Sequence, residues 1–382
     1  MSGKRLLIIG GGFGGAAAAR TLRSLLGGEH SVTLVDRQRR AYLCGSLPWL
    51  IVGQRQPQKI SRSLGALIQR GVNYVQAEVE GIDVLRQRVQ TSAGALPYDY
   101  LIVATGAEYD WNAVPGSTQA HSFYNLDTAR KLRDALRRFR QGRIVIAVSR
   151  LPYKCPPAPY EAAMLLDSAF AERGVRRGID IHVFTPEPTP LAILGPAASG
   201  AFKERLAKRG ITIHTGQTLK EVGPDDRGTM FLSGETMSAD LLITVPAHRA
   251  PAILREAGLT NGTGWVPVEP GTLATQSEGI YAVGDATFLP MGNGAPLPKT
   301  GVFASAEGEL VGHNLAAEIT GGAKARFTGD GFCFVDYGGS KAALVMGGFL
   351  AEGAPQVAML SPSVKWHRRK VRFEADWRRW RI

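Results

Sequence analysis

The chain has 382 residues, 44% of them hydrophobic and 20% charged, which is enough to bury the cores of two or three globular domains. Its net charge is +12, and half of this surplus lies in the last 18 residues, where eight basic side chains accompany two acidic ones. No stretch of 18 apolar residues exists and no nucleic-acid-binding pattern accompanies the charge, so we expect neither a membrane-spanning helix nor a nucleic-acid partner.

The first predicted element is a buried strand over residues 6–9 that runs directly into a glycine-rich turn. The turn follows the pattern G-x-G-x-x-G, with Gly10, Gly12 and Gly15. A helix is expected over 16–26, and a second strand over 31–35 ends on Asp36, roughly 20 residues beyond the glycines. Such a turn lets backbone N–H groups approach a pyrophosphate, and the acid is placed to hold a ribose hydroxyl. The pattern predicts a dinucleotide-binding domain, the alternative being a tight turn without a ligand.

Cys44 lies shortly after this acid, and a lone cysteine is more often a buried, inert thiol than a reactive one. We expect a short helix over 60–71 and two strands within 72–89. Residues 110–119 read as a linker at a domain boundary, because proline, glycine and polar residues gather there.

Two later strands indicate which dinucleotide is bound. They cover 98–106 and 279–285 and end on short polar signatures. The signature residues are Thr105 and Gly106 in the first strand and Gly284 and Asp285 in the second. Both segments resemble the later FAD fingerprints of flavoproteins with two dinucleotide-binding domains, in which the acid holds the ribityl and phosphate part of the cofactor. We therefore predict FAD.

A second dinucleotide-binding fold is predicted to begin with the buried strand over 143–148. The loop that follows, 149–161, has four prolines and no glycine, whereas a loop that cradles a pyrophosphate needs free N–H donors. We expect a Rossmann-like domain that lacks a working NAD(P)H phosphate loop and that presents Cys155 on a rigid backbone. This argues against a nicotinamide dehydrogenase.

The remaining elements complete the two domains. Helices are expected over 160–170 and 198–209, strands over 179–185, 211–215 and 241–245, and a return to the first domain over 265–273. A helix over 302–319 follows Lys299, and its N-terminus and this lysine are placed to favour negative charge on the flavin ring, although a solvated lysine explains the position as well. Cys333 falls in a strand, turn and strand over 331–345.

The final segment, 365–382, is basic and rich in tryptophan. Its aromatic residues recur at spacings that place them on one helical face: Trp366, Phe373, Trp377 and Trp380. Such a helix is typical of a membrane interface, and the alternative is an aromatic face docked on the protein's own core.

With these residues in view, the chain resembles the family of sulfide:quinone oxidoreductases and flavocytochrome c sulfide dehydrogenases, nearly from end to end. The most specific segments are KCPPAPYE around Cys155 and CFVDYG around Cys333. The resemblance implies that these cysteines form a redox-active disulfide, or a sulfur-bridged pair, facing the flavin. Glu161 matches a carboxylate near the disulfide that can accept a proton, though an acid in the first turn of a helix also has a structural reason. Cys44 matches in place a cysteine that binds the flavin covalently in the flavocytochrome branch, but the GSLP that follows departs from the usual continuation.

The resemblance implies an α/β fold with two Rossmann-like domains and a C-terminal membrane-associating region. The expected boundaries are 1–110 and 262–325 for the FAD domain, 111–261 for the second domain, and 326–382 for the C-terminal region.

The implied activity is FAD-dependent oxidation of sulfide to zero-valent sulfur or polysulfide. Electrons would pass to a membrane quinone, in a peripheral protein of a prokaryotic cell membrane without a visible signal peptide or a metal. The alternative acceptor is a cytochrome c, as in the flavocytochrome branch. Type II NADH dehydrogenases share the fold but need the missing phosphate loop. The non-enzymatic alternative is a redox sensor, in which the cysteine pair acts only as a switch.

Overall fold

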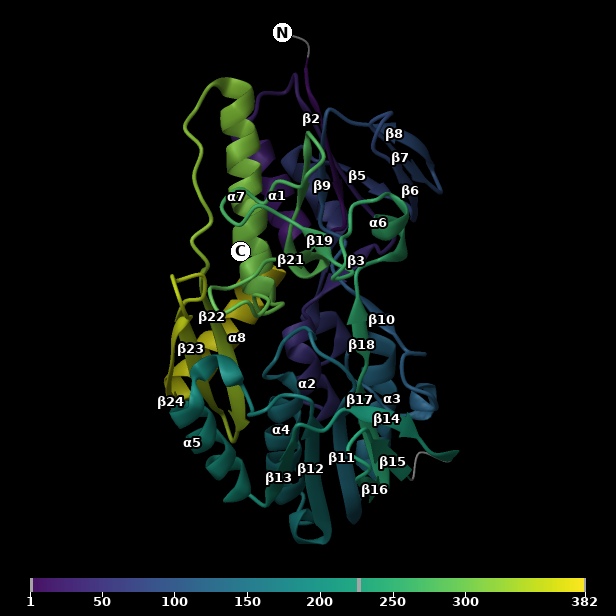
Figure 1. The fold of residues 1–382 in the computed structure, drawn as a ribbon, viewed down its shortest axis with the longest axis vertical. Coiled ribbons are helices and arrows are strands. Elements are labelled where there is room, and N and C mark those ends of the chain that lie inside the picture. Colours follow the sequence, from purple (N-terminus) through teal and green to yellow (C-terminus); the bar gives the residue numbers. More distant parts are fainter. Residues whose placement is uncertain (1–2, 225–227, 381–382) are drawn as a thin grey trace.

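The computed structural model describes residues 3–224 and 228–380, and its two larger sheets lie one above the other in Figure 1. The upper sheet has the strand order β20-β9-β1-β2-β5. Its strands are β1 (Arg5–Ile9), β2 (Ser31–Asp36), β5 (Asn73–Gln76), β9 (Tyr100–Val103) and β20 (Ile280–Ala282). All of its pairings are parallel, and because β20 pairs with β9, the chain returns to this sheet after forming the lower one.

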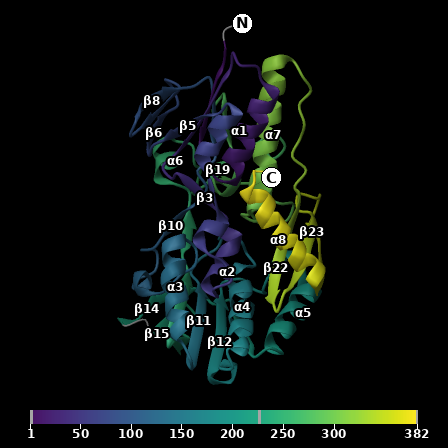
Figure 2. The ribbon, with the colours of Figure 1, turned by 180° about the vertical axis from the view of Figure 1, so that it is seen from behind.

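Helices α1 (Phe13–Leu25) and α7 (Gly301–Thr320) pack along each other beside the upper sheet, as both views show (Figure 1 and Figure 2). Their approach is close because Gly308 has no side chain: a Cβ atom there would lie 2.1 Å from the carbonyl oxygen of Gly14. This packing brings the start of α7 to the same cavity as the glycine-rich turn before α1.

The lower sheet is also parallel, with the order β13-β12-β11-β17. Its strands are β11 (Gly142–Val148), β12 (Ile179–Thr185), β13 (Ile211–Thr215) and β17 (Leu241–Val245). Helix α4 (Ala158–Glu172) connects β11 to β12, and helix α5 (Pro196–Ala207) connects β12 to β13. The succession of strand, loop, helix and parallel strand therefore occurs in both sheets, which confirms the predicted α/β class with two Rossmann-like units.

The two sheets are linked by β10 (Glu108–Asp110) and β18 (Ala247–Arg249), which pair antiparallel. The other elements are α2 (Leu47–Ile51), α3 (Leu126–Arg138), α6 (Ala252–Glu256), β3 (Arg40–Tyr42), β4 (Ser61–Ser63), β6 (Val79–Asp83), β7 (Arg88–Thr91), β8 (Gly94–Pro97), β14 (Leu219–Val222), β15 (Gly228–Phe231), β16 (Thr236–Ser238), β19 (Val266–Pro267) and β21 (Thr287–Phe288).

Residues 60–71 do not form the predicted helix. Ser61–Ser63 pair with β3 as β4, and Leu64–Arg70 form a 3₁₀ helix. Leu64 and Leu67 are both fully buried there, and their spacing of three matches the 3₁₀ period rather than the α period.

The C-terminal part consists of an antiparallel sheet and one helix, which lies across the sheet in Figure 2. Its strands are β22 (Asp330–Gly338), β23 (Lys341–Gly348) and β24 (Gln356–Ser363), and its helix is α8 (Val364–Arg378). Cys333 lies in β22, as the predicted strand, turn and strand require.

The aromatic side of α8 is docked on the protein itself. Trp377 is 1% exposed and Trp380 8%, and the guanidinium carbon of Arg62 lies 4.3 Å and 3.7 Å from their ring centroids. The interpretation of this face as a membrane contact is therefore wrong for these two tryptophans, because protein groups already cover them. The exposed side of α8 is basic instead. Within 3–224 and 228–380, none of the helices combines the length and apolarity needed to cross a bilayer.

Candidate functional site

A cavity of about 400 Å³ is lined by residues from the glycine-rich turn, the proline-rich loop, the start of α7, β22 and α8. All of the predicted site residues except Gly15 line it. They are Gly10, Gly12, Asp36, Cys44, Thr105, Gly106, Cys155, Glu161, Gly284, Asp285, Lys299 and Cys333. Folding thus gathers into one place the dinucleotide signatures and the three cysteines.

Gly10, Gly12 and Gly15 of the turn have different structural roles. Gly10 has φ of +101°, and a Cβ there would lie 2.3 Å from the carbonyl oxygen of Ala104. A Cβ on Gly15 would lie 1.9 Å from the carbonyl oxygen of Gly10, so Gly15 serves helix–strand packing and does not face the cavity. At Gly12 a Cβ would meet no described atom within 4 Å, which leaves the space beside the backbone open for a ligand.

The acid at the end of β2 is tied to the turn. The amide of Gly11 donates a hydrogen bond of 2.7 Å to Oδ2 of Asp36, and the amide of Gln38 donates one of 2.7 Å to Oδ1. Burial nevertheless raises the pKa of Asp36. Thr105 Oγ1 is buried without a hydrogen-bond partner among the described residues, so this hydroxyl is available to a ligand in the cavity. These groups fit FAD.

Lys299 holds protein backbone. Its Nζ atom donates hydrogen bonds of 2.8 Å to the carbonyl oxygen of Asp285 and 2.9 Å to that of Thr287, and it lies 3.6 Å from the ring centroid of Trp265. Burial lowers the pKa of Lys299 to about 8. The carboxylate of Glu307, on α7, accepts a hydrogen bond from the amide of Gly284. The ammonium group thus supports the turn at 284–287.

The proline-rich loop holds Cys155 in an unusual backbone conformation, with φ of +56°. Its amide donates a hydrogen bond of 2.8 Å to the carbonyl oxygen of Lys299, which ties the loop to the segment before α7. Two residues earlier, the hydroxyl of Tyr153 is 3.0 Å from the carbonyl oxygen of Pro156 and 3.1 Å from Oε2 of Glu187. A left-handed conformation at a non-glycine residue persists only where surrounding contacts impose it, and this loop supplies them.

Glu187 was not predicted as a site residue. It follows β12 much as Asp36 ends β2, where an acid would hold a nucleotide ribose. Here its carboxylate accepts hydrogen bonds from Tyr160 at 2.6 Å and from Thr185 at 3.1 Å, in addition to Tyr153. The acid therefore anchors the cysteine loop.

The thiols of Cys155 and Cys333 face the same buried space. Burial raises the pKa of Cys155, and the nearby Cys333 adds to the rise. Burial also raises the pKa of Cys333 to about 12, with Glu161 as the second cause. In the reduced pair both sulfurs are therefore held as thiols at neutral pH, and a neighbouring group must take their protons before either acts as a nucleophile.

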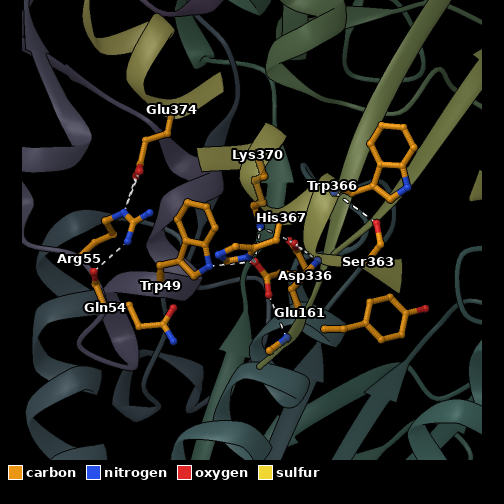
Figure 3. Close-up of polar contacts among 12 residues, drawn as sticks. Trp49, Gln54, Arg55, Glu161, Asp336, Ser363, Trp366, His367, Lys370 and Glu374 are labelled. Carbon is orange, nitrogen blue, oxygen red and sulfur yellow. Dashed lines mark hydrogen bonds and ion pairs between the residues drawn. The ribbon is translucent and has the colours of Figure 1, made fainter. Parts of the chain in front are cut away.

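Figure 3 shows a buried cluster of charged side chains. Two of its members, Glu161 and Lys370, line the same cavity as the cysteines. Glu161 is 2% exposed, and its Oε1 atom accepts hydrogen bonds from Lys370 Nζ at 2.7 Å and from the amide of Asp336 at 2.6 Å. Asp336, which is fully buried, accepts a hydrogen bond of 2.9 Å from Trp49 Nε1. Burial raises the pKa of Glu161, while Lys370 opposes the rise.

Sequence reasoning missed Lys370 and Asp336. Lys370 is one of eight basic residues in the tail, and nothing local distinguishes it from its exposed neighbours. Asp336 did carry a signal, because it interrupts the apolar run around Cys333, and a lone acid in a buried strand needs partners.

Cys44 lies in a short 3₁₀ helix, Cys44–Ser46, and is exposed to the cavity. Its Sγ atom is 3.8 Å from Nζ of Lys154, the residue before Cys155. The segment is fixed from the other side, because Ser46 Oγ donates a hydrogen bond of 2.7 Å to Glu374 of α8. Cys44 is thus an accessible thiol beside a cation and differs from the buried, inert thiol that is the commoner case.

The sequence model of the pyridine nucleotide-disulphide oxidoreductase family matches residues 4–147 and 160–308. The gap between the two matched parts contains Cys155 and most of the proline-rich loop, and Cys333 lies beyond the second part. The general family pattern therefore covers both Rossmann-like units and leaves the cysteine pair outside.

Individual relatives cover more of the chain. The mitochondrial sulfide:quinone oxidoreductase of Mus musculus is 26% identical over 301 residues, which are 75% of this chain and 66% of that protein, just under two thirds of its length. The sulfide-quinone reductase of Aquifex aeolicus is 26% identical over 332 residues, or 83% of this chain and 77% of that one. A type II NADH:quinone oxidoreductase of Staphylococcus saprophyticus is 21% identical, with 83% of each chain covered.

The solved structure of the sulfide:quinone oxidoreductase from Aquifex aeolicus has the same fold, with a TM-score of 0.88 at 24% identity over 98% of this chain and 92% of that chain. The family match extends over well more than half of the sequence, and the cavity has the groups that an FAD site needs. The chain therefore belongs to the pyridine nucleotide-disulphide oxidoreductase family, as a flavoprotein oxidoreductase whose relatives include sulfide:quinone oxidoreductases.

Proposed function

We propose that this protein is a sulfide:quinone oxidoreductase that uses FAD and the pair Cys155 and Cys333 to oxidise sulfide to zero-valent sulfur or polysulfide. The observation that carries the proposal is that both thiols line the cavity that also contains the glycine-rich turn and the Gly284–Asp285 turn. The proline-rich loop supports thiol chemistry over nicotinamide chemistry, because it offers no cradle for a second pyrophosphate.

We assign the domains by the part of the site that each contributes. We assign residues 1–110 and 262–325 to the FAD domain and 111–261 to a second domain whose role is to carry the Cys155 loop. Residues 326–382 supply Cys333 and the helix that closes the cavity, although 381 and 382 lie outside the described residues.

The chemistry begins from the oxidised pair, a disulfide between Cys155 and Cys333. A hydrosulfide ion attacks one sulfur, the bond between the two cysteines breaks, and a new sulfur–sulfur bond makes one cysteine a persulfide while the other leaves as a thiolate. FAD, when bound, supplies a two-electron acceptor in the same cavity. A second hydrosulfide then attacks the outer sulfur of the persulfide and leaves with it as a hydropolysulfide, and the second cysteine is released as a thiolate. The two thiolates form their disulfide again as the pair loses two electrons to the bound acceptor.

Glu161 is the group best placed to take the proton that sulfur loses. It lines the cavity with both cysteines, and it influences the pKa of each. Its own raised pKa makes it a better proton acceptor than an exposed glutamate. Lys370, 2.7 Å away, balances the negative charge after the proton has left again.

A quinone acceptor is supported by the aromatic wall of the cavity. Phe332, Phe334 and Phe373 line both this cavity and a neighbouring hollow of about 560 Å³. The other residues around that hollow are Arg368, Arg369, Arg372 and Asp376. These aromatic rings therefore lie between the cavity and a basic surface, which suits an apolar acceptor reached from an anionic membrane surface. We propose that the protein lies on the membrane through this basic side of α8.

The test is a reaction of the purified holoenzyme with sulfide and with NADH under anaerobic conditions. We expect rapid bleaching of the flavin absorbance by sulfide and none by NADH. In parallel, turnover with a soluble quinone and with cytochrome c identifies the acceptor. Bleaching by NADH but not by sulfide would overturn the proposal. Reduction of cytochrome c by sulfide without reduction of quinone would show that cytochrome c, and not quinone, is the acceptor.

A further inference from the structure

His367 of α8 lies next to Asp336 and Trp49 in the buried cluster (Figure 3). Its Nδ1 atom is 3.5 Å from Oδ2 of Asp336, and Lys370 Nζ is 3.6 Å from the same oxygen. Lys370 Nζ is also 2.7 Å from Oε1 of Glu161. Four ionisable groups are thus neighbours within 4 Å: His367, Asp336, Lys370 and Glu161. Lys370 and Glu161 are hydrogen-bonded, whereas Nδ1 of His367 is buried without a hydrogen-bond partner among the described residues.

The end of this cluster at His367 is more exposed than the other three groups. Glu161 is 2% exposed and Asp336 is 0% exposed, the side chain of Lys370 is 9% exposed, and that of His367 is 19% exposed. Glu161 and Lys370 line the cavity, whereas His367 does not. The cluster thus has an inner end at the cavity and an outer end that reaches solvent.

The cluster has one more carboxylate than ammonium groups, and one additional proton would neutralise it. Two buried carboxylates accompany one ammonium group, and a buried net charge is unfavourable unless it is neutralised. The N–H groups of Trp49 and Gly338 donate to Asp336 and keep it an acceptor. Glu161 is the acid that takes the additional proton most readily, because burial and Asp336 raise its pKa while Lys370 opposes the rise.

The proposed reaction consumes a proton. Oxidation of hydrosulfide to zero-valent sulfur releases two electrons and one proton, while reduction of a quinone to a quinol takes up two electrons and two protons. One proton per turnover must therefore come from solvent. We propose that His367 and Asp336 form the outer end of a proton path that delivers it to the cavity through Lys370 and Glu161; the proposal rests on the function proposed above.

The groups near His367 lie on four elements. They are Asp336 of β22, Lys370 of its own helix, Glu161 of α4 behind them, and the ring of Trp49 of α2 at a centroid distance of 5.8 Å. Imidazole is the side chain best suited to exchange protons near neutral pH.

The test separates the two halves of the reaction in the holoenzyme. His367→Ala is compared with His313→Ala, an exposed histidine on α7 that serves as a matched control. We expect flavin bleaching by sulfide to change less than twofold in H367A, whereas quinone turnover falls at least about tenfold above neutral pH and recovers with added imidazole. H313A should behave as the unaltered enzyme.

A second variant distinguishes proton transfer from packing. His367→Gln keeps a polar side chain of similar size but carries no exchangeable charge, so it should be as slow as H367A. Full activity of H367Q, an unchanged pH profile of H367A, or loss of turnover without rescue by imidazole would each overturn the path. An unaltered enzyme that sulfide does not bleach would refute the proposed function and the path together, whereas normal bleaching with unaffected H367A turnover refutes the path alone.

Discussion

The hydroxyl of Tyr160 donates a hydrogen bond of 2.6 Å to the buried carboxylate of Glu187. This contact joins the first turns of α4 to the end of β12, and Tyr153 of the cysteine loop reaches the same oxygen at 3.1 Å. In a nucleotide-binding unit an acid at this place would be free for a ribose. Here hydroxyl groups of the protein donate to this carboxylate. The second Rossmann-like unit therefore holds the Cys155 loop in place.

Tyr160→Phe tests this anchor. It removes one of three hydroxyl donors to a buried carboxylate, and we expect the free energy of unfolding to fall by about 1–3 kcal/mol. Tyr74→Phe is the matched control, because Tyr74 donates to the carbonyl oxygen of Gln38 at the surface and should cost at most about 0.5 kcal/mol. Denaturant unfolding of both variants gives the comparison. Equal losses would show that the contact to Glu187 is not special.

Cys155→Ser and Cys333→Ser test the redox pair. Neither serine can take part in a disulfide, so each single variant should lose sulfide-dependent turnover by about three orders of magnitude, and the double variant should be no slower than the singles. FAD content should stay unchanged, since the glycine-rich turn and Asp36 are untouched. Steady-state assays with sulfide and quinone measure the effect. A variant that keeps more than a tenth of the activity would contradict the mechanism.

Cys44→Ser tests a covalent link to the flavin. Cys44 faces the cavity, and its sulfur lies 3.8 Å from the ammonium group of Lys154. We expect acid precipitation of the unaltered protein to leave yellow colour in the pellet and that of C44S to release it. Free FAD in the supernatant of the unaltered protein would rule out the link.

Glu307→Gln tests how the turn at 284–287 responds to pH. Burial raises the pKa of Glu307 from 4.5 to about 7, so the folded state holds this proton more tightly than the unfolded state. The resulting stabilisation is complete below pH 4.5 and is lost as the pH rises through 7, by about 3 kcal/mol over that window. A glutamine keeps the acceptor for the Gly284 amide without titrating, so E307Q should show a flatter stability curve.

The matched control is Glu309→Gln, an exposed glutamate two residues further along α7. Unfolding of the holoproteins is followed at pH 5 and at pH 7.5. The lowered pKa of Lys299, about 8, acts mainly above this range and does not obscure the result. Parallel pH curves for E307Q and the unaltered protein would show that Glu307 does not titrate in this window.

Replacing Arg368, Arg369 and Arg372 with glutamine tests the membrane surface. All three are exposed on α8, and each basic residue near an anionic surface contributes about 1 kcal/mol. We expect binding to vesicles that contain phosphatidylserine to weaken by at least about tenfold, and the difference to vanish at high salt. Sedimentation with vesicles measures it.

The control for this triple variant changes the same number of charges elsewhere. Arg130, Arg137 and Arg138 are exposed on α3, and their replacement should leave vesicle binding within about twofold of the unaltered protein. Equal weakening by both triple variants would indicate attraction by net charge alone and would speak against a defined membrane face.

Local patterns were sufficient to predict both Rossmann-like units and a proline-rich loop in place of the second phosphate loop, whereas FAD was predicted from a resemblance to flavoprotein fingerprints. A glycine or a proline acts on its own backbone, and a buried strand or an amphipathic helix shows its period over ten residues, so such features can be read from neighbouring letters. The pairing of Cys155 with Cys333 came from a resemblance, since no local pattern links residues 178 positions apart.

Only the tertiary structure decided which charged and aromatic side chains of the tail are buried. Trp377 and Trp380 have the spacing of a membrane-facing stripe but pack on Arg62, and Lys370 lies within a basic helix but pairs with Glu161. The physical reason is that a charge or an indole becomes buried through partners from other elements. The energetic balance of desolvation against those partners exists only once the elements have come together.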